Sequence, residues 1–162
     1  MNTRAVRHGL PRTVVALGLV SLCNDAASEM VVPLLPLFLT ATLGAGPAIV
    51  GLIEGVAEAT ASILKVVSGR LADRGFGARR LVLSGYAASG LARPAIGLAL
   101  GWAWVLALRF MDRVGKGLRT APRDAMIAAA VPGRLLGRAF GFHRAMDHAG
   151  AVIGPLAAFA LL

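Results

Sequence analysis

Charged residues are scarce in this sequence, and negatively charged ones are the scarcest. Of its 162 residues 15% are charged and 57% are hydrophobic, and 8 Asp and Glu stand against 17 Lys and Arg. A soluble domain carries about 25% charged residues and about 45–50% apolar ones. With a mean hydropathy of +0.72, this shortage of charge excludes an ordinary soluble domain and predicts a protein that sits in a lipid bilayer.

The chain also lacks cysteine apart from Cys23, which excludes a disulfide within it. Its net charge of +9 does not indicate nucleic-acid binding, because a soluble basic domain would not also carry several apolar stretches of about 20 residues. The N-terminal basic flank and apolar core are typical of a signal peptide that ends at a lipoprotein cysteine. Leu22 is too large for such a processing site and apolar sequence resumes at 31–39, so we expect a retained first span.

The apolar stretches predict an all-α fold, a polytopic membrane helix bundle of about five transmembrane helices. Lipid leaves the backbone of an open chain no other hydrogen-bond partner than its own helix. The predicted spans are 13–43, 48–67, 81–100, 101–129 and 136–162. Prolines within or near them predict kinks, because neighbouring helices can satisfy the freed carbonyls: Pro33, Pro36, Pro94, Pro122 and Pro155.

Basic residues gather at alternate connections between the predicted spans. The connections at 40–47 and 98–103 carry no Lys or Arg. Since basic loops stay on the cytoplasmic side, the N-terminus and the basic connections are predicted to be cytoplasmic. The arginines concerned are Arg4, Arg7 and Arg12 before the first span, Arg70, Arg74, Arg79 and Arg80 after the second, and Arg134 and Arg138 before the fifth.

Ionisable residues also lie inside the predicted spans, where they are expensive and usually face a bundle interior or a wet cavity. The simpler interpretation of any single ionisable residue is that it neutralises an opposite charge and only holds two helices together. The set comprises Asp25, Glu29, Glu54, Glu58, Asp112 and Asp147 among the acids, and Arg93, Arg109, Arg113, Lys116, His143, Arg144 and His148 among the bases.

Helical phase gathers these residues on particular faces. In the second span Gly51, Glu54, Gly55, Glu58, Ser62, Lys65 and Gly69 share one face, and the Gly51–Gly55 pair predicts close approach of another helix there. In the fourth span a cationic stripe comprises Arg109, Asp112, Arg113, Lys116, Arg119, Thr120 and Arg123. A helix lying on the membrane surface would show the same stripe. Trp102 and Trp104 at the outer end favour a crossing helix instead.

In the fifth span His143, Asp147, Gly150 and Gly154 line up on one face. His143 and His148 are five residues apart and point in different directions, so we expect no metal site. No cofactor is expected either.

Three segments resemble signatures of the major facilitator superfamily of transporters. The first is the loop after the second span, formed by Gly69, Leu71, Ala72, Asp73, Arg74, Gly77, Arg79 and Arg80. The second is Arg109 with Gly115 and Gly117, and the third is Gly150, Gly154 and Pro155, which is similar to the family's antiporter signature. "RFMDRVGKGLRTAPRDAMIAAA" and "NDAASEMVVPLLPLFL" resemble a poorly characterised prokaryotic branch of the superfamily, and the likeness covers 14–158.

The resemblance implies most of the N-terminal six-helix half of a twelve-helix transporter, which works by alternating access around a central cavity. Because the chain ends inside apolar sequence at Leu161 and Leu162, we expect a truncated part of a longer protein, whose missing C-terminal half is a partner. The expected location is the plasma membrane, with lipid, a small-molecule substrate and H⁺ as further partners.

In the family, the first and fourth helices of this half line the cavity. On that basis Asp25, Glu29 and Arg109 are expected to couple transport to protons, with Asn24, Arg93, Arg113 and Lys116 around the substrate. Burial raises the pKa of a carboxylate and a facing arginine lowers it. A carboxylate subject to both effects can take up and release a proton. The loop residues Gly69, Asp73, Arg74, Gly77, Arg79 and Arg80 would form a cytoplasmic gate, and Asp147 belongs with the glycines of the fifth span.

The sequence favours proton-coupled efflux slightly, because the fifth-span resemblance is to exporters. Import of a small organic or phosphorylated anion stays open, since a cavity whose bases outnumber its acids attracts anions. An intramembrane enzyme using His143, Asp147 and His148 is a weaker alternative, because no serine or cysteine nucleophile lies near them. The third alternative is a structural membrane protein whose buried charges only pair between subunits.

Overall fold

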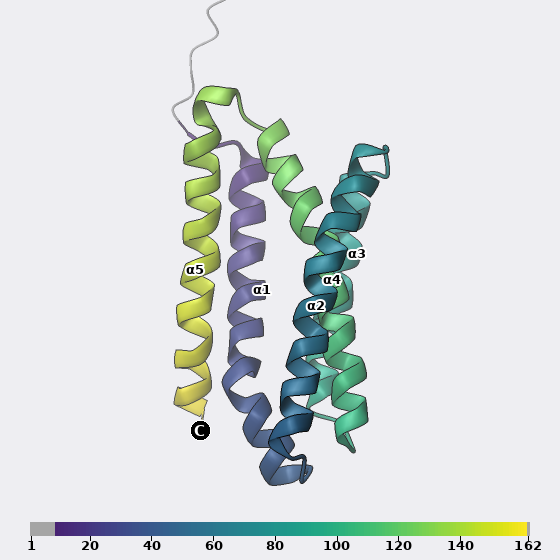
Figure 1. The fold of residues 1–162 in the computed structure, drawn as a ribbon. Helices are drawn as coiled ribbons and strands as arrows, with labels where there is room; N and C mark the ends of the chain where they lie inside the picture. Colours follow the sequence, from purple (N-terminus) through teal and green to yellow (C-terminus); the bar gives the residue numbers. More distant parts are fainter. Residues whose placement is uncertain (1–8, 162) are drawn as a thin grey trace, which may run out of the picture.

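The computed structural model describes residues 9–161 and is built from helices alone within that range (Figure 1). The long helices are α1 (Arg12–Leu37), α2 (Pro47–Asp73), α3 (Ala78–Ile96), α4 (Trp102–Ala129) and α5 (Leu136–Leu161). A π-helical turn, η1 (Phe38–Thr42), extends α1, and a short 3₁₀ helix, η2 (Gly133–Leu135), precedes α5. The predicted all-α fold is confirmed. Arg4, Arg7 and Leu162 lie outside the described residues.

The helices form two groups. In Figure 1, α1 and α5 stand side by side, and α2, α3 and α4 form the other group, in which α4 packs on both α2 and α3. Contacts between the groups are few and come mainly from α1 with α3 and α4, and from α4 with α5. The two groups therefore enclose a space between them that long side chains from both must share.

A helix lies in each of the five predicted ranges, but the ends differ from those predicted. α2 continues past 67 to Asp73. The backbone hydrogen bonds of a helix also form outside lipid, so its polar last turns extend beyond the apolar segment. α3 ends at Ile96, before residue 100, and Gly97 is its C-cap. All five prolines named above lie within helices, and α1 widens into η1 soon after Pro33 and Pro36.

Glycines set the close approaches within each group. A methyl group on Gly85 of α3 would meet the carbonyl oxygen of Gly115 of α4, and the reverse contact is equally tight. Gly150 and Gly154 of α5 press on the α1 backbone, where an added Cβ would lie 2.6 Å from the Leu22 oxygen and 2.5 Å from the Ala26 oxygen, respectively. These contacts are typical of small residues at membrane helix interfaces.

The close approach predicted at Gly51 and Gly55 is not found among residues 9–161. A Cβ at either glycine would meet nothing within 4 Å, although Glu54 on the same face accepts hydrogen bonds from Arg109 of α4. The glycines that matter for packing are those of α3, α4 and α5.

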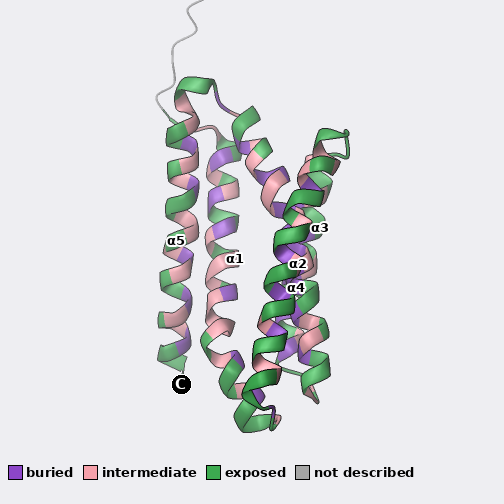
Figure 2. Cartoon of the chain, in the orientation of Figure 1, coloured by how far each residue is buried: buried purple, intermediate pink, exposed green. Residues whose placement is uncertain are grey.

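Outward faces are apolar, and burial follows the facing sides of the helices (Figure 2). Large exposed side chains include Leu91, Trp104, Phe110, Ile63 and Phe159. Within the described range, one helical stretch, Arg12–Thr42, is long and apolar enough by its own composition to cross a membrane. α4 is amphipathic instead: its charged stripe is buried and Phe110 and Met111 on the other side are exposed. That orientation disagrees with a surface-lying helix, which would turn its charges outward.

Gly150→Ala tests the packing of α5 on α1. The new methyl group would overlap the Leu22 carbonyl, and we expect a loss of about 1–3 kcal/mol of stability, as for other overpacked sites. The measurement is the thermal denaturation midpoint in detergent. Gly51→Ala is the matched control: it meets open space and should leave the midpoint unchanged or raise it, since alanine is about 1 kcal/mol better in a helix than glycine. Equal midpoints for the two variants would contradict this packing.

Candidate functional site

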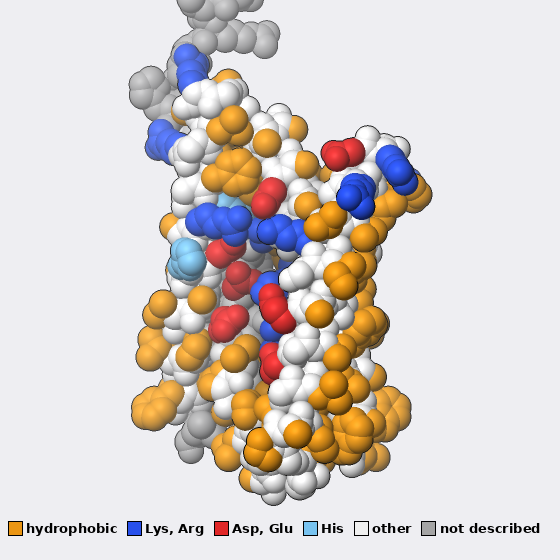
Figure 3. Space-filling model, in the orientation of Figure 1, with side chains coloured by type: hydrophobic (Ala, Val, Ile, Leu, Met, Phe, Trp, Pro, Cys, Tyr) orange, Lys and Arg blue, Asp and Glu red, His pale blue; other side chains and the backbone are white. Residues whose placement is uncertain are grey.

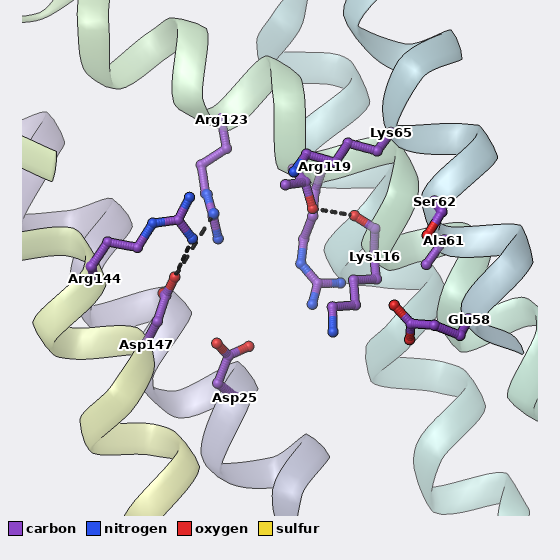
Figure 4. A pocket seen from close by; sticks show the side chains of 11 residues that line it. Asp25, Glu58, Ala61, Ser62, Lys65, Lys116, Arg119, Arg123, Arg144 and Asp147 are labelled. Atoms are coloured by element: carbon purple, nitrogen blue, oxygen red, sulfur yellow. Dashed lines mark hydrogen bonds and ion pairs between the residues drawn. The ribbon is translucent and has the colours of Figure 1, made fainter. Parts of the chain in front are cut away.

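A polar cavity of about 330 Å³ lies between the two helix groups (Figure 4). Four helices contribute to it, because each turns its ionisable face toward the space that the groups share. The lining residues are Asp25 from α1, Glu58, Ala61, Ser62 and Lys65 from α2, Lys116, Arg119, Thr120 and Arg123 from α4, and Arg144 and Asp147 from α5.

The cavity carries an excess of positive charge. Five of its lining residues are basic and three are acidic, and Figure 3 shows blue and red side chains gathered in the hollow between the groups. Within the described chain, the amino groups of Lys65 and Lys116 form no ion pair or hydrogen bond. Two cationic groups are therefore free to meet a solute.

A buried ion-pair network lies beside the cavity and joins α2, α3 and α4. Asp112, whose side chain is 1% exposed, lies 3.0 Å from Arg93 Nε and 3.5 Å from Arg109 Nη1. Arg109 in turn donates two hydrogen bonds to Glu54, at 2.9 and 3.1 Å. Such paired geometry is what lets charge remain inside a membrane protein, since an unpaired partner would cost several kcal/mol.

Polar contacts also bridge the two helix groups. Arg93 Nη1 of α3 donates to the Asn24 backbone oxygen of α1 at 2.7 Å and to its side-chain oxygen at 3.0 Å. Arg123 of α4 donates to the Ser21 hydroxyl of α1 at 3.0 Å. These contacts connect the groups around the cavity, and two apolar clusters also join the groups: Leu35 and Leu39 with Ile53, Ile96 and Val105, and Val14 and Ala139 with Ile127.

A second charged cluster lies where α4 meets α5. Asp147 Oδ2 is 3.4 Å from His143 Nδ1, 3.5 Å from Arg144 Nη1 and 3.9 Å from Arg123 Nη2. Asp124 adds contacts to both arginines, at 3.2 Å to Arg123 and 3.8 Å to Arg144. Asp147 thus lies at the centre of the cluster and also lines the cavity.

The structure separates the residues predicted to couple protons. Asp25 lines the cavity together with Lys116, whereas Arg109 is held by Glu54 and Asp112. Glu29 is partly buried beside Gly154 and is not among the residues that line the cavity. Arg109 contacts neither carboxylate, because the cationic stripe of α4 extends over several turns and its outer end faces α2 and α3.

The predicted substrate residues also divide. Lys116 lines the cavity, while Asn24 and Arg93 bind each other beside it. Arg113 is 5% exposed, does not line the cavity, and has no hydrogen bond or ion pair within residues 9–161. Helical phase places four further cavity residues on polar faces of their helices: Glu58, Lys65, Arg119 and Arg123. Phase alone does not tell which faces meet, so it did not predict that these residues would line a cavity.

The loop between α2 and α3 holds the other predicted group. Gly75 has φ of +87°, which favours glycine, and Gly77 precedes α3. Asp73 ends α2 and is exposed, Arg74 follows it, and Arg79 and Arg80 stand in the first turn of α3. Among the described residues Asp73 forms no ion pair in this conformation. Gly69 lies within α2 against Ala121 of α4.

Residues 9–161 contain no cluster of three or more His, Cys, Asp or Glu that could hold a metal ion. His143 is buried and His148 is exposed on α5. The two histidines thus point to different surroundings, as their spacing predicts.

An all-helical bundle with apolar outer faces and a charged internal cavity is the architecture expected of a membrane protein. The family model of the Major Facilitator Superfamily matches residues 17–162. The chain belongs to this superfamily, as the sequence motifs predict, and its members are transporters and not enzymes.

Several curated proteins are similar to the chain. It is 39% identical over 145 residues to "Uncharacterized MFS-type transporter MJ1317" of Methanocaldococcus jannaschii, covering 90% of this chain and 36% of that protein. It is 40% identical over 158 residues to "Uncharacterized protein Rv2265" of Mycobacterium tuberculosis, covering 93% and 37%. "Multidrug resistance protein MdtH" of Enterobacter sp. is 31% identical over 128 residues, covering 78% and 31%.

The chain thus spans little more than a third of the length of the curated relatives it matches, 36% and 37% for the first two named. No solved structure gives a significant match.

Asp112→Asn tests the buried network. The amide keeps the shape but removes the charge between Arg93 and Arg109, so we expect a loss of about 3–5 kcal/mol, the range for breaking a buried pair. Thermal denaturation in detergent measures it. Asp73→Asn changes an exposed carboxylate that has no ion pair among the described residues, so it should shift the midpoint little. A comparable loss of stability in both variants would show that the buried network does not stabilise the fold more than an exposed carboxylate does.

Proposed function

We propose that a transporter containing this chain moves a small solute with an anionic group across the membrane, together with protons, by alternating access. The observation that carries this is the cavity's charge: five bases against three acids, with Lys65 and Lys116 unpaired among the described residues. A cavity of net positive charge between apolar helices raises the local concentration of anions. The same charge disfavours a cationic substrate.

Proton coupling follows from the carboxylates in the same cavity. When Asp25 or Glu58 takes up a proton, it stops neutralising the neighbouring bases, and the cavity becomes more positive. Protons and an anion therefore favour each other's binding, and by linkage the effect is reciprocal. Transport of protons and an anion in the same direction requires that each strengthens the binding of the other. Asp25 is the principal coupling residue in this proposal, and Glu29, one turn along α1, assists it.

Proton-driven export is the second candidate. Two observations favour it: the Gly150–Pro155 segment of α5, which resembles the antiporter signature, and the likeness to a protein named as a multidrug resistance protein. Export against protons requires the opposite linkage, in which solute and proton compete for the cavity.

We place the protein in the plasma membrane with the N-terminus in the cytoplasm. The α2–α3 loop and the α4–α5 connection lie at the same end of the bundle as the start of α1 (Figure 1). Arg74, Arg80 and Arg134 gather at this end, which the positive-inside rule assigns to the cytoplasm. In this proposal the loop around Asp73 serves as a gate, and Asp73 finds its partner when the cytoplasmic helix ends close.

The sign of proton movement tests the proposal in vesicles containing the full-length transporter. The probes are inorganic phosphate, pyruvate and the cation ethidium. We expect addition of phosphate or pyruvate to draw protons into the vesicle lumen with the anion, and Asp25→Asn with Glu29→Gln to remove this proton movement. Ethidium export with proton movement in the opposite direction would favour the second candidate, and absence of any anion movement would overturn the first.

Lys116→Gln tests the contact with the solute. Loss of an unpaired cation from the cavity should raise the half-saturating concentration of the transported anion about 10–100-fold, since hydrogen bonds to charged groups contribute about 1.5–3 kcal/mol. The measurement is initial uptake against anion concentration. Arg134→Gln removes a basic side chain outside the cavity and should leave the curve unchanged. A Lys116→Gln curve that coincides with it would exclude Lys116 as a solute contact.

A further inference from the structure

His143 and Asp147 form a buried dyad on α5 whose hydrogen bonding is incomplete. His143 is 1% exposed, and its Nδ1 lies 3.4 Å from Asp147 Oδ2, one helical turn further on. Two buried atoms of the dyad, His143 Nε2 and Asp147 Oδ1, have no hydrogen-bond partner among the described residues. Both residues therefore have an atom that can still accept a hydrogen bond or a proton.

Incomplete satisfaction argues against a dyad that serves packing alone. A buried polar atom without a partner costs about 1–3 kcal/mol, and two such atoms in one pair of residues need an explanation beyond structural locking. A proton or a water molecule that comes and goes supplies one. Asp147 lines the cavity, and its side chain is 13% exposed, so the dyad is in contact with the space that opens to solvent.

Charged groups surround the dyad from every helix packed against it. Asp25 of α1 lines the same cavity on the neighbouring helix (Figure 4), Arg123 and Asp124 come from α4, and Arg144 comes from α5 itself. With His143 neutral, the two arginines are balanced by Asp124 and Asp147. A proton on His143 makes this cluster net positive by one charge.

We propose that the His143–Asp147 dyad is a second proton-binding site of the transporter, and that its protonation releases Arg123 toward the anion in the cavity. The inference rests on the proposed function for the anion, but not for the proton. With Nδ1–H donating to Asp147, the free lone pair of Nε2 takes the proton, and no other bond changes. The His143–Asp147 hydrogen bond then becomes charge-assisted and stronger.

Competition at one oxygen transmits the change to the cavity. Asp147 Oδ2 lies 3.4 Å from His143 Nδ1 and also holds Arg144 at 3.5 Å and Arg123 at 3.9 Å. A stronger bond to the imidazolium weakens the longest of these contacts, which is the one to Arg123. Arg123 keeps its hydrogen bonds to the Ser21 hydroxyl and to Asp124, and its charge, less neutralised by Asp147, acts more strongly on the solute.

The first test follows the histidine itself. In the full-length transporter, with histidine ¹³C-labelled at Cε1, the signal lost in His143→Gln should shift when the pH is varied over the range in which transport responds to pH. The same signal should shift differently in Asp147→Asn, which also identifies it if His143→Gln does not fold. His148→Gln is the matched control, because it removes an exposed histidine of the same helix and leaves this signal in place. A His143 signal that stays constant over this range would overturn the proposal.

The second test measures coupling with inorganic phosphate as the probe. His143→Gln should lower the number of protons that enter with each phosphate and flatten the pH dependence of uptake, while His148→Gln should not. Unchanged coupling in His143→Gln would refute the dyad's role and leave the proposed function standing. A His143 signal that responds to pH in a protein that moves no anion would support the dyad and refute the proposed function.

Discussion

The structure depends on one constraint, that a charge inside a helix bundle is costly unless it is paired or faces water, and among the described charged residues of α4 Arg113 is the exception. Asp112 shows the first solution, since it holds Arg93 and Arg109 with almost no exposed surface. Lys116 shows the second, since it lines the cavity without an ion pair within the described chain. The fourth helix uses both solutions along one face, because its stripe passes from the packed side of the bundle to the space between the helix groups.

The arrangement of the helices follows from the same division. Tight glycine contacts fasten α5 to α1 and α3 to α4, whereas the two groups are joined both by apolar clusters and by hydrogen bonds from Arg93 and Arg123. Apolar packing is indifferent to protons and solutes, but polar contacts are not. A change of charge in the cavity therefore acts first on the polar contacts between the groups.

The cavity also changes the balance between the two directions of transport. The motif in α5 favours export, and it is the glycines of this motif that pack on α1, so the motif has a structural role whatever the direction. Charge bears on the solute more directly, because Asp25, Glu58 and Asp147 share the cavity with more bases than they can neutralise. In the proposed function, this net charge attracts an anion, and its dependence on carboxylate protonation couples the anion to protons.

Sequence by itself determined the membrane environment, the all-helical fold and the family, because apolar length, basic loops and short motifs are local properties of the chain. Helical phase also placed the charges of α4 on one face, which the structure confirms. Only the tertiary structure decided which charges meet. Arg109 pairs with Glu54 and Asp112 instead of facing Asp25, and Asp147 contacts His143, Arg123 and Arg144. The physical reason is that pairing depends on the rotation and spacing of helices far apart in the chain, and those are set by where glycines such as Gly115 and Gly150 let backbones touch.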